Sequence, residues 1–182
     1  MLGLTAFGAF HTAIALVAVA CGFIALARDK QISSGTRVGQ AYLVTTLATA
    51  VTALGIFHHG GFGPPHVLAL LTIGALGVGT TAGRSRLFGR ASRDVQAISY
   101  SSTILFHMIP AVSESATRLP PGAPLVASLD APVLRGVALV LLAAFLVGVT
   151  LQVRWLRRSM PTGTSVPFSH PRSSQGGGHV TR

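Results

Sequence analysis

Charged side chains are scarce in this chain of 182 residues, because Asp, Glu, Lys and Arg together account for only 10% of it. Soluble domains carry about 25% charged residues, so the composition excludes an ordinary water-soluble domain. Hydrophobic residues make up 49% of the chain, and the mean hydropathy is +0.60. The few charges form short clusters between apolar runs of about 20 residues, the length that an α-helix needs to cross a bilayer. The sequence therefore predicts an all-α integral membrane protein.

Acidic residues and cysteine are rarer still. Four Asp and Glu residues stand against fourteen Lys and Arg residues, which gives a net charge of +10. Such an excess is found in nucleic-acid-binding proteins, but the cytoplasmic loops of membrane proteins show it too. We therefore expect lipid and not nucleic acid to be the partner. The single cysteine, Cys21, lies within the first apolar run, which excludes an intramolecular disulfide and predicts a small buried thiol.

Five apolar runs predict a bundle of five transmembrane helices in residues 1–159, at about 4–27, 38–58, 65–83, 95–115 and 131–153. The first run lacks the charged start of a signal peptide and is long enough to span, so we expect it to be retained. Pro64 and Pro65 suit the first turn of the third helix, while Asp130 suits the N-cap of the fifth. Residues 160–182 are rich in Pro, Gly, Ser and Thr and are expected to form a disordered tail.

The distribution of basic residues predicts the orientation of the bundle. Three Lys and Arg residues follow the first run, four follow the third, and five follow the fifth, so twelve of the fourteen fall on one side. Arg118 and Arg135 fall on the other side. Lys and Arg accumulate in cytoplasmic loops. We therefore expect the N-terminus outside and the C-terminal tail in the cytoplasm.

With this topology, five of the seven histidines map to the outer half of the membrane: His11, His58, His59, His66 and His107. At 1.5 Å per residue, His11 and His107 come to similar depths, on the order of 10 Å below the outer boundary. The other two histidines lie in the tail.

Polar residues on two of the helices recur at helical spacing. Tyr100, His107 and Glu114 are seven residues apart and share one face of the fourth helix, while Thr49 and Thr52 belong to a stripe on the second. Polar and ionisable groups at membrane depth are costly and usually face a partner or a functional site. The two stripes therefore predict a polar seam inside the bundle that leads to the histidines.

Neutral imidazole is the commonest protein ligand for transition metals. We expect His11 and His107 to bind a cofactor, either heme b by axial ligation or a transition-metal ion. The second candidate is a metal site formed by His58, His59 and His66, with Glu114 orienting a ligating histidine. Two other interpretations stay open, namely hydrogen bonding between helices and the handling of protons or solutes.

A resemblance to a known family starts from the stretch Gly60-Gly61-Phe62-Gly63-Pro64-Pro65-His66-Val67-Leu68, which leads through an apolar helix to an Arg-rich loop. Phe106-His107-Met108-Ile109-Pro110, and Glu114 followed by Arg118-Leu119-Pro120, extend the similarity. Residues 38–120 thus resemble a bacterial family of uncharacterised multi-pass inner-membrane proteins. The family usually has a histidine in the basic loop and another near the start of the second helix, and this sequence has neither. The resemblance implies a bacterial cytoplasmic membrane as the location and brings no established activity.

We do not expect an enzyme, because the aspartates lie on loops or at helix starts and do not align with Ser and His for nucleophilic catalysis. The predicted function is a small multi-pass membrane protein that binds heme or a metal ion in support of respiratory redox chemistry or cofactor handling. The alternatives are a cofactor-free membrane protein that binds a membrane protein partner or a second copy of itself, and a small transporter. The absence of an internal repeat argues against the transporter.

Overall fold

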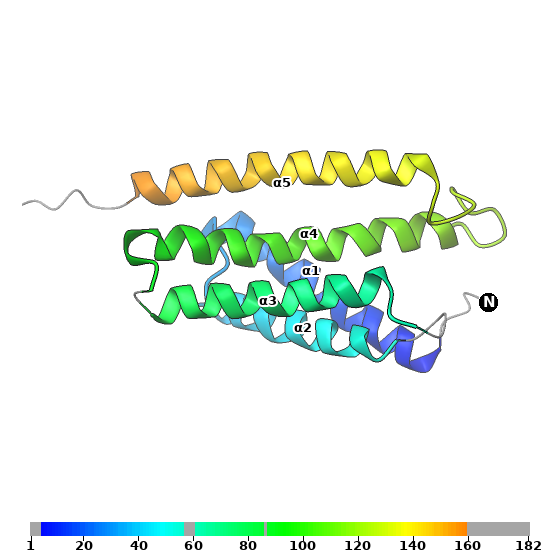
Figure 1. Cartoon of the computed structure of the whole chain (residues 1–182), viewed down its shortest axis with the longest axis horizontal. Coiled ribbons are helices and arrows are strands. Elements are labelled where there is room, and N and C mark those ends of the chain that lie inside the picture. The colour runs from blue at the N-terminus through cyan, green and yellow to red at the C-terminus, as the bar shows by residue number, and fades with distance from the viewer. Residues whose placement is uncertain (1–4, 57–60, 86, 160–182) are drawn as a thin grey trace, which may run out of the picture.

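The computed structural model describes residues 5–56, 61–85 and 87–159, which fold into five α-helices and one short 3-10 helix. The elements are α1 (Ala6–Asp29), α2 (Arg37–Leu54), α3 (Pro64–Arg84), η1 (Gly89–Ala91), α4 (Ser92–Arg118) and α5 (Pro132–Arg158). Successive helices run in opposite directions, so that α1, α3 and α5 are parallel and α2 and α4 return between them (Figure 1). The predicted all-α class with five helices is confirmed.

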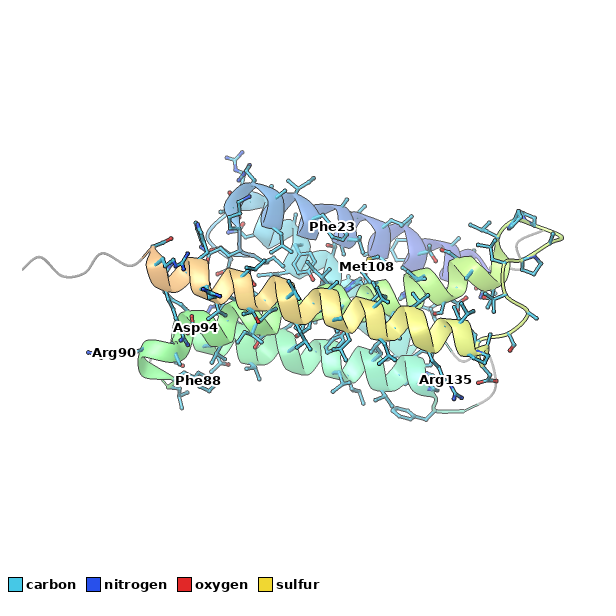
Figure 2. All side chains as sticks on the ribbon, turned by 90° about the horizontal axis from the view of Figure 1, so that it is seen from above. Phe23, Phe88, Arg90, Asp94, Met108 and Arg135 are labelled. Atoms are coloured by element: carbon cyan, nitrogen blue, oxygen red, sulfur yellow. The ribbon has the colours of Figure 1, made fainter. Side chains whose placement is uncertain are left out.

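Four of the helices close a ring. Helix α1 packs on α2, α2 on α3 and α3 on α4, and α4 also touches α1, while α5 packs mainly on α4 at one edge (Figure 1). Arg90 and Arg135 project at opposite ends of this bundle (Figure 2). We call the end with Arg90, where α3 ends and α4 begins, the basic end. The opposite end, where α1 and α3 begin, is called the histidine end.

Helix starts follow local capping chemistry. Thr5 and Thr36 accept hydrogen bonds from the backbone N–H groups of Gly8 and Gly39, at 3.0 and 3.1 Å, as N-cap threonines do. Helix α3 begins at Pro64, as predicted. The predicted N-cap of the fifth helix is wrong, because Ala131 and not Asp130 occupies this position, and it makes no side-chain capping bond.

Two helices are longer than the apolar runs that predict them. Helix α4 spans 92–118 where 95–115 was expected, and α5 continues to Arg158 where an end near 153 was expected. Hydropathy marks only the part of a helix that suits hydrocarbon, whereas arginine is itself a good helix former and extends the helix beyond it. Helix α2 instead ends early, at Leu54, and Gly55 is its C-cap. The predicted helix end near 58 and the predicted tail at 160–182 lie outside the described residues.

Small and polar side chains are common in the interior of the bundle, and large apolar side chains cover much of its surface. Among the buried residues are Thr46, Thr103 and Ala18, each 0% exposed, whereas Leu139 and Val140 on α5 are 66% and 69% exposed. A soluble protein buries its large apolar side chains to remove them from water. In a bilayer the hydrocarbon tails cover them, and small and polar residues lie between the helices.

Among the residues that the structure describes, three helices are long and apolar enough to cross a membrane: α1, α3 and α5. Burial is least in α5, where 6% of an apolar stretch of 18 residues is buried, compared with 33% of the corresponding stretch in α3. Helices α2 and α4 are more polar and supply most of the buried polar side chains. These features indicate a multi-pass membrane protein in contact with lipid.

Two tyrosines fill the ring of helices, and each lies against a glycine of a neighbouring helix. Tyr42 on α2 is 0% exposed and Tyr100 on α4 is 1% exposed. A Cβ atom at Gly22 would lie 2.7 Å from Cε2 of Tyr42, and one at Gly79 would lie 2.5 Å from Cε1 of Tyr100. Any side chain at either glycine would therefore displace a buried ring. The two glycines allow the helix pairs α1–α2 and α3–α4 to approach closely.

Polar bonds attach α5 at the basic end. Arg157 donates to the Asp94 carboxylate from its Nη2 at 2.8 Å and from its Nε at 2.9 Å. The Asp94 side chain is nearly buried, whereas that of Arg157 is 67% exposed. Gln152 accepts from Ser101 at 2.8 Å and donates to the Lys30 carbonyl at 2.9 Å. These bonds connect the C-terminal half of α5 to α4 and to the end of α1.

Replacement of Gly79 tests the packing of α3 on α4. We expect Gly79→Leu to lower the thermal unfolding midpoint in detergent, with a destabilisation of about 1–3 kcal/mol from overpacking. Gly77→Leu on the same helix is the matched control, because an added Cβ there meets nothing within 4 Å. Equal midpoints for the two variants would contradict the packing described here.

Removal of Arg157 and removal of Asp94 should lower the unfolding free energy by different amounts. Arg157→Ala leaves a buried carboxylate without its counter-charge, so we expect a loss of about 1–2 kcal/mol in unfolding free energy, moderated by the exposure of the arginine. Asp94→Asn leaves an arginine that water can solvate, so we expect a smaller loss of unfolding free energy than for Arg157→Ala. Arg158→Ala removes an exposed charge and serves as the control. A larger effect of Asp94→Asn than of Arg157→Ala would contradict this account.

Candidate functional site

The histidines predicted to bind a cofactor lie on helices that neighbour one another. His11 is on the first part of α1 and His107 is on the second half of α4, two helices that are in contact. Each imidazole has its own hydrogen-bond partner, His11 on Thr52 and His107 on Thr103, and the pairing of the two rings stays a prediction. His58 and His59 lie outside the described residues.

His107 is held in one tautomer by its own helix. Its Nδ1 atom lies 2.7 Å from the carbonyl oxygen of Thr103, and a carbonyl oxygen can only accept, so Nδ1 carries the proton. In the neutral ring the lone pair is then on Nε2. This atom is buried and has no hydrogen-bond partner among the described residues. A fixed Nδ1–H donated to a backbone carbonyl, with Nε2 left over, is the usual arrangement of a metal-ligating histidine.

Tyr42 positions the backbone that holds His107. The Thr103 hydroxyl donates to the Tyr100 carbonyl at 2.7 Å, so it accepts the phenolic proton of Tyr42 at 2.5 Å. The rings of Tyr42 and His107 are 6.5 Å apart between centroids and inclined at 45°. Because Tyr42 also packs against Gly22, it joins α1, α2 and α4 at the level of the histidine.

His11 is anchored from α2. Its Nδ1 atom lies 2.8 Å from the hydroxyl oxygen of Thr52. That hydroxyl is within bonding distance of the Ala48 and Thr49 carbonyls, at 2.8 and 3.0 Å, and it has one proton to give. When this proton goes to a carbonyl, Thr52 accepts from Nδ1–H of His11, and the lone pair of His11 is on Nε2. In this arrangement both histidines form a hydrogen bond through Nδ1, and the lone pair of each ring is on Nε2.

His66 and Glu114 have local partners. His66 is in the first turn of α3, where its Nδ1 accepts the N–H of Gly63 at 3.2 Å, and its ring stacks on Phe62 at 5.2 Å. Glu114 is ion-paired with Arg118 on the same helix, at 2.6 Å, and its side chain is 47% exposed. Among the residues that the structure describes, no group of three or more His, Cys, Asp or Glu residues is placed to hold a metal ion. A metal site formed with His58 and His59 stays a prediction.

The predicted polar seam exists along α4. Tyr100, Thr103 and His107 are all buried, and the Tyr100 hydroxyl lies 3.1 Å from that of Thr80 on α3. Glu114 lies beyond the seam on a partly exposed turn. Thr52 was expected on the stripe of α2, but the role of Tyr42 was missed. Its position three residues before Thr45 and seven before Thr49 was the signal that could have revealed it.

The described residues therefore form two hydrogen-bonded groups within the α1, α2 and α4 part of the ring, His107 with Thr103 and Tyr42, and His11 with Thr52. The likeness of residues 38–120 to a bacterial membrane-protein family stays a prediction. No family model, curated protein or solved structure matches the chain.

Proposed function

We propose that all five helices cross the bilayer, with the N-terminus outside and the C-terminal tail in the cytoplasm of a bacterial cell. The parallel directions of α1, α3 and α5 support five spans, because the chain must return across the same thickness through α2 and α4. Helix α2 has 18 residues, and at 1.5 Å per residue it is about 27 Å long, close to the hydrocarbon thickness of roughly 30 Å. The concentration of arginines at the basic end supports a cytoplasmic location for that end.

A pair of C-terminal reporter fusions tests this orientation. We expect a reporter that is active only in the cytoplasm to work and one that is active only outside the membrane to be silent, because α5 ends at the basic end. The same reporters fused after residue 124, between α4 and α5, should give the opposite pattern. Reversed results at both sites would invert the orientation, and identical results at both sites would show that α5 does not span.

Within this bundle we propose that His11 and His107 bind a transition-metal ion or the iron of a heme. The observation that carries the proposal is the buried Nε2 atom of His107, which has a lone pair and no hydrogen-bond partner among the described residues. A buried polar atom without a partner is costly, and a metal ligand bond would satisfy it. His11 approaches from α1 with its own Nδ1 anchored on Thr52.

The surroundings of the histidines favour a bare ion over a macrocycle. The Tyr42 ring lies beside His107, and its contact with Gly22 leaves no gap between α1 and α2 on that side of His107. A single ion requires only the approach of two Nε2 atoms to about 2.0–2.1 Å from it. Two protein ligands leave coordination positions open, which suits an ion that is passed on or that binds a small molecule. A bound ion of this kind would supply Lewis acidity or a redox couple.

The chain's own residues perform three tasks in this proposal. Thr103 and Thr52 fix the orientation of the imidazoles, as hydrogen-bonded neighbours of metal ligands do. Tyr42 donates to Thr103 and so keeps the α4 backbone in place. The apolar outer faces of the helices exclude water from the side, which strengthens interactions at the site. A redox or cofactor-handling role follows from this arrangement.

Metal analysis and the absorption spectrum of the purified protein test the site directly. We expect His11→Ala and His107→Ala each to abolish binding of the ion, or of heme if a Soret band is present, while the helical circular dichroism is retained. His66→Ala is the matched control, because His66 is engaged at the start of α3 and should not affect the content. Thr52→Val should weaken metal affinity by about 10–100-fold, since it removes an orienting partner.

Three results would contradict this assignment. Full metal or heme content in His107→Ala would exclude His107 as a ligand. Loss of content in His66→Ala alone would move the site to the loop between α2 and α3. A wild-type protein that takes up no metal or heme, together with a lower melting temperature for His107→Ala, would favour hydrogen bonding between helices as the role of these histidines.

A further inference from the structure

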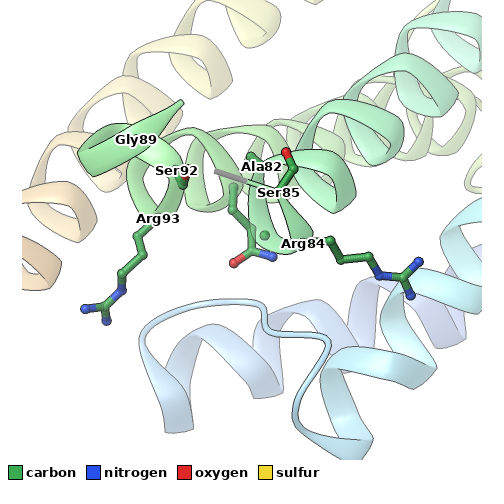
Figure 3. A pocket seen from close by; sticks show the side chains of 8 residues that line it. Ala82, Arg84, Ser85, Gly89, Ser92 and Arg93 are labelled. Atoms are coloured by element: carbon green, nitrogen blue, oxygen red, sulfur yellow. The ribbon is translucent and has the colours of Figure 1, made fainter. Parts of the chain in front are cut away.

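A pocket of about 320 Å³ lies at the basic end, between the end of α3 and the start of α4 (Figure 3). We call it the basic pocket. Its lining residues with polar or charged side chains are Arg84, Ser85, Ser92, Arg93 and Gln96. It lies at the start of α4, whereas His107 is in the second half of that helix, and no residue of the candidate histidine site lines it.

Two unpaired arginines flank the basic pocket. Arg84 and Arg93 lie on opposite sides of it with their guanidinium groups pointing away from one another, and Ser85 and Ser92 lie between them (Figure 3). Both arginines are exposed, and neither makes an ion pair with any residue that the structure describes. The nearby acidic side chain, Asp94, is turned to α5 and is occupied by Arg157. The pocket is therefore positively charged without internal neutralisation.

The wall of the basic pocket holds a hydroxyl group that lacks a partner. Ser92 Oγ is buried and makes no hydrogen bond with the described residues. Beside it, Gln96 lies against Gly83 so closely that a Cβ atom there would overlap the Gln96 amide. A buried hydroxyl is costly unless a ligand completes its hydrogen bond. Together with two guanidinium groups, such a hydroxyl suits the oxygen atoms of a phosphate.

Apolar side chains beside the basic pocket indicate where this phosphate comes from. Leu87 and Phe88, in the loop between α3 and α4, are 77% and 42% exposed. Phe88 projects from the side of the bundle, whereas Arg90 projects beyond its end (Figure 2). This loop carries apolar side chains on one side and a basic side chain on another, and it follows the candidate span α3. Such a loop suits the headgroup level of a bilayer, where aromatic and basic residues are common. A dissolved phosphate would gain nothing from Leu87 and Phe88.

We propose that the basic pocket binds the phosphate of an anionic phospholipid. The exposed side chains of Arg84 and Arg93 turn inward to donate to the phosphate oxygens from two sides, and the Ser92 hydroxyl donates from the wall. The acyl chains then run beside Leu87 and Phe88 toward the outer faces of α3 and α4. This site fixes the depth of the basic end in the membrane and does not depend on the histidine pair.

Native mass spectrometry of the full-length protein in a neutral detergent tests the site by titration with phosphatidylglycerol and, separately, with phosphatidylcholine. We expect the wild type to bind the first phosphatidylglycerol molecule at least about tenfold more tightly than phosphatidylcholine, because charge-assisted bonds add to the apolar contact. Arg84→Gln with Arg93→Gln should remove this preference. The matched control is Arg154→Gln with Arg158→Gln, which removes two exposed arginines from the same end and should retain it. Ser92→Ala keeps every charge and should reduce the preference without changing the helix content.

Equal loss in both double variants would overturn the proposal, because it would show general attraction between a basic surface and anionic lipid. Equal binding of the two lipids by the wild type would also overturn it. Inorganic phosphate added alone distinguishes the source of the ligand, since binding as tight as that of phosphatidylglycerol would identify a site for free phosphate. If the Arg84 and Arg93 variant loses its helix content, Ser92→Ala decides, because an unchanged preference in that variant would exclude the pocket.

Discussion

Thr103 connects His107 to Tyr42. Its carbonyl oxygen accepts the Nδ1 proton of His107, and its hydroxyl accepts the phenolic proton of Tyr42. Thr103 is 0% exposed, so water does not compete for either bond and each contributes to the stability of the folded bundle. The tautomer of the imidazole, the position of the Tyr42 ring and the need for a glycine at position 22 all follow from this one residue.

The polar bonds of the bundle are concentrated on α4, the helix with the most polar face. It is bonded to α5 through Asp94 and Ser101, and to α2 through Thr103, and its Tyr100 hydroxyl lies beside Thr80 of α3. Polar side chains on such a face have an unfavourable free energy in contact with lipid, and this cost is avoided when they face other helices. Its central position is therefore a consequence of its composition, and the more apolar α1, α3 and α5 present their outer faces to the hydrocarbon.

The sequence was sufficient for the helices, since apolar runs of membrane length can fold in few other ways. It was less informative about the ends of the helices, because Asp94 and Arg157 are helical residues that lie beyond the apolar runs. The ion pair between them joins two helices and has no local signal in the sequence. Gly79 and Gly83 have the spacing of a close-packing motif, but in a chain with 21 glycines this spacing means little until Tyr100 and Gln96 are seen against them. The pairing of His11 and His107 is predicted from spacing and depth. Their anchors were not all found, because a hydrogen bond to a carbonyl of the same helix has no sequence signature.

The order in which the chain is made bears on the histidine pair. His11, Tyr42, Thr52, Thr103 and His107 all precede α5 in the chain, and they lie on helices of a ring that closes through the contact of α1 with α4. Helices enter a membrane one after another as they leave the ribosome, and α5 adds no residue to this group. The proposed site therefore needs no ligand from α5, and its protein ligands can all enter the membrane before the last helix does.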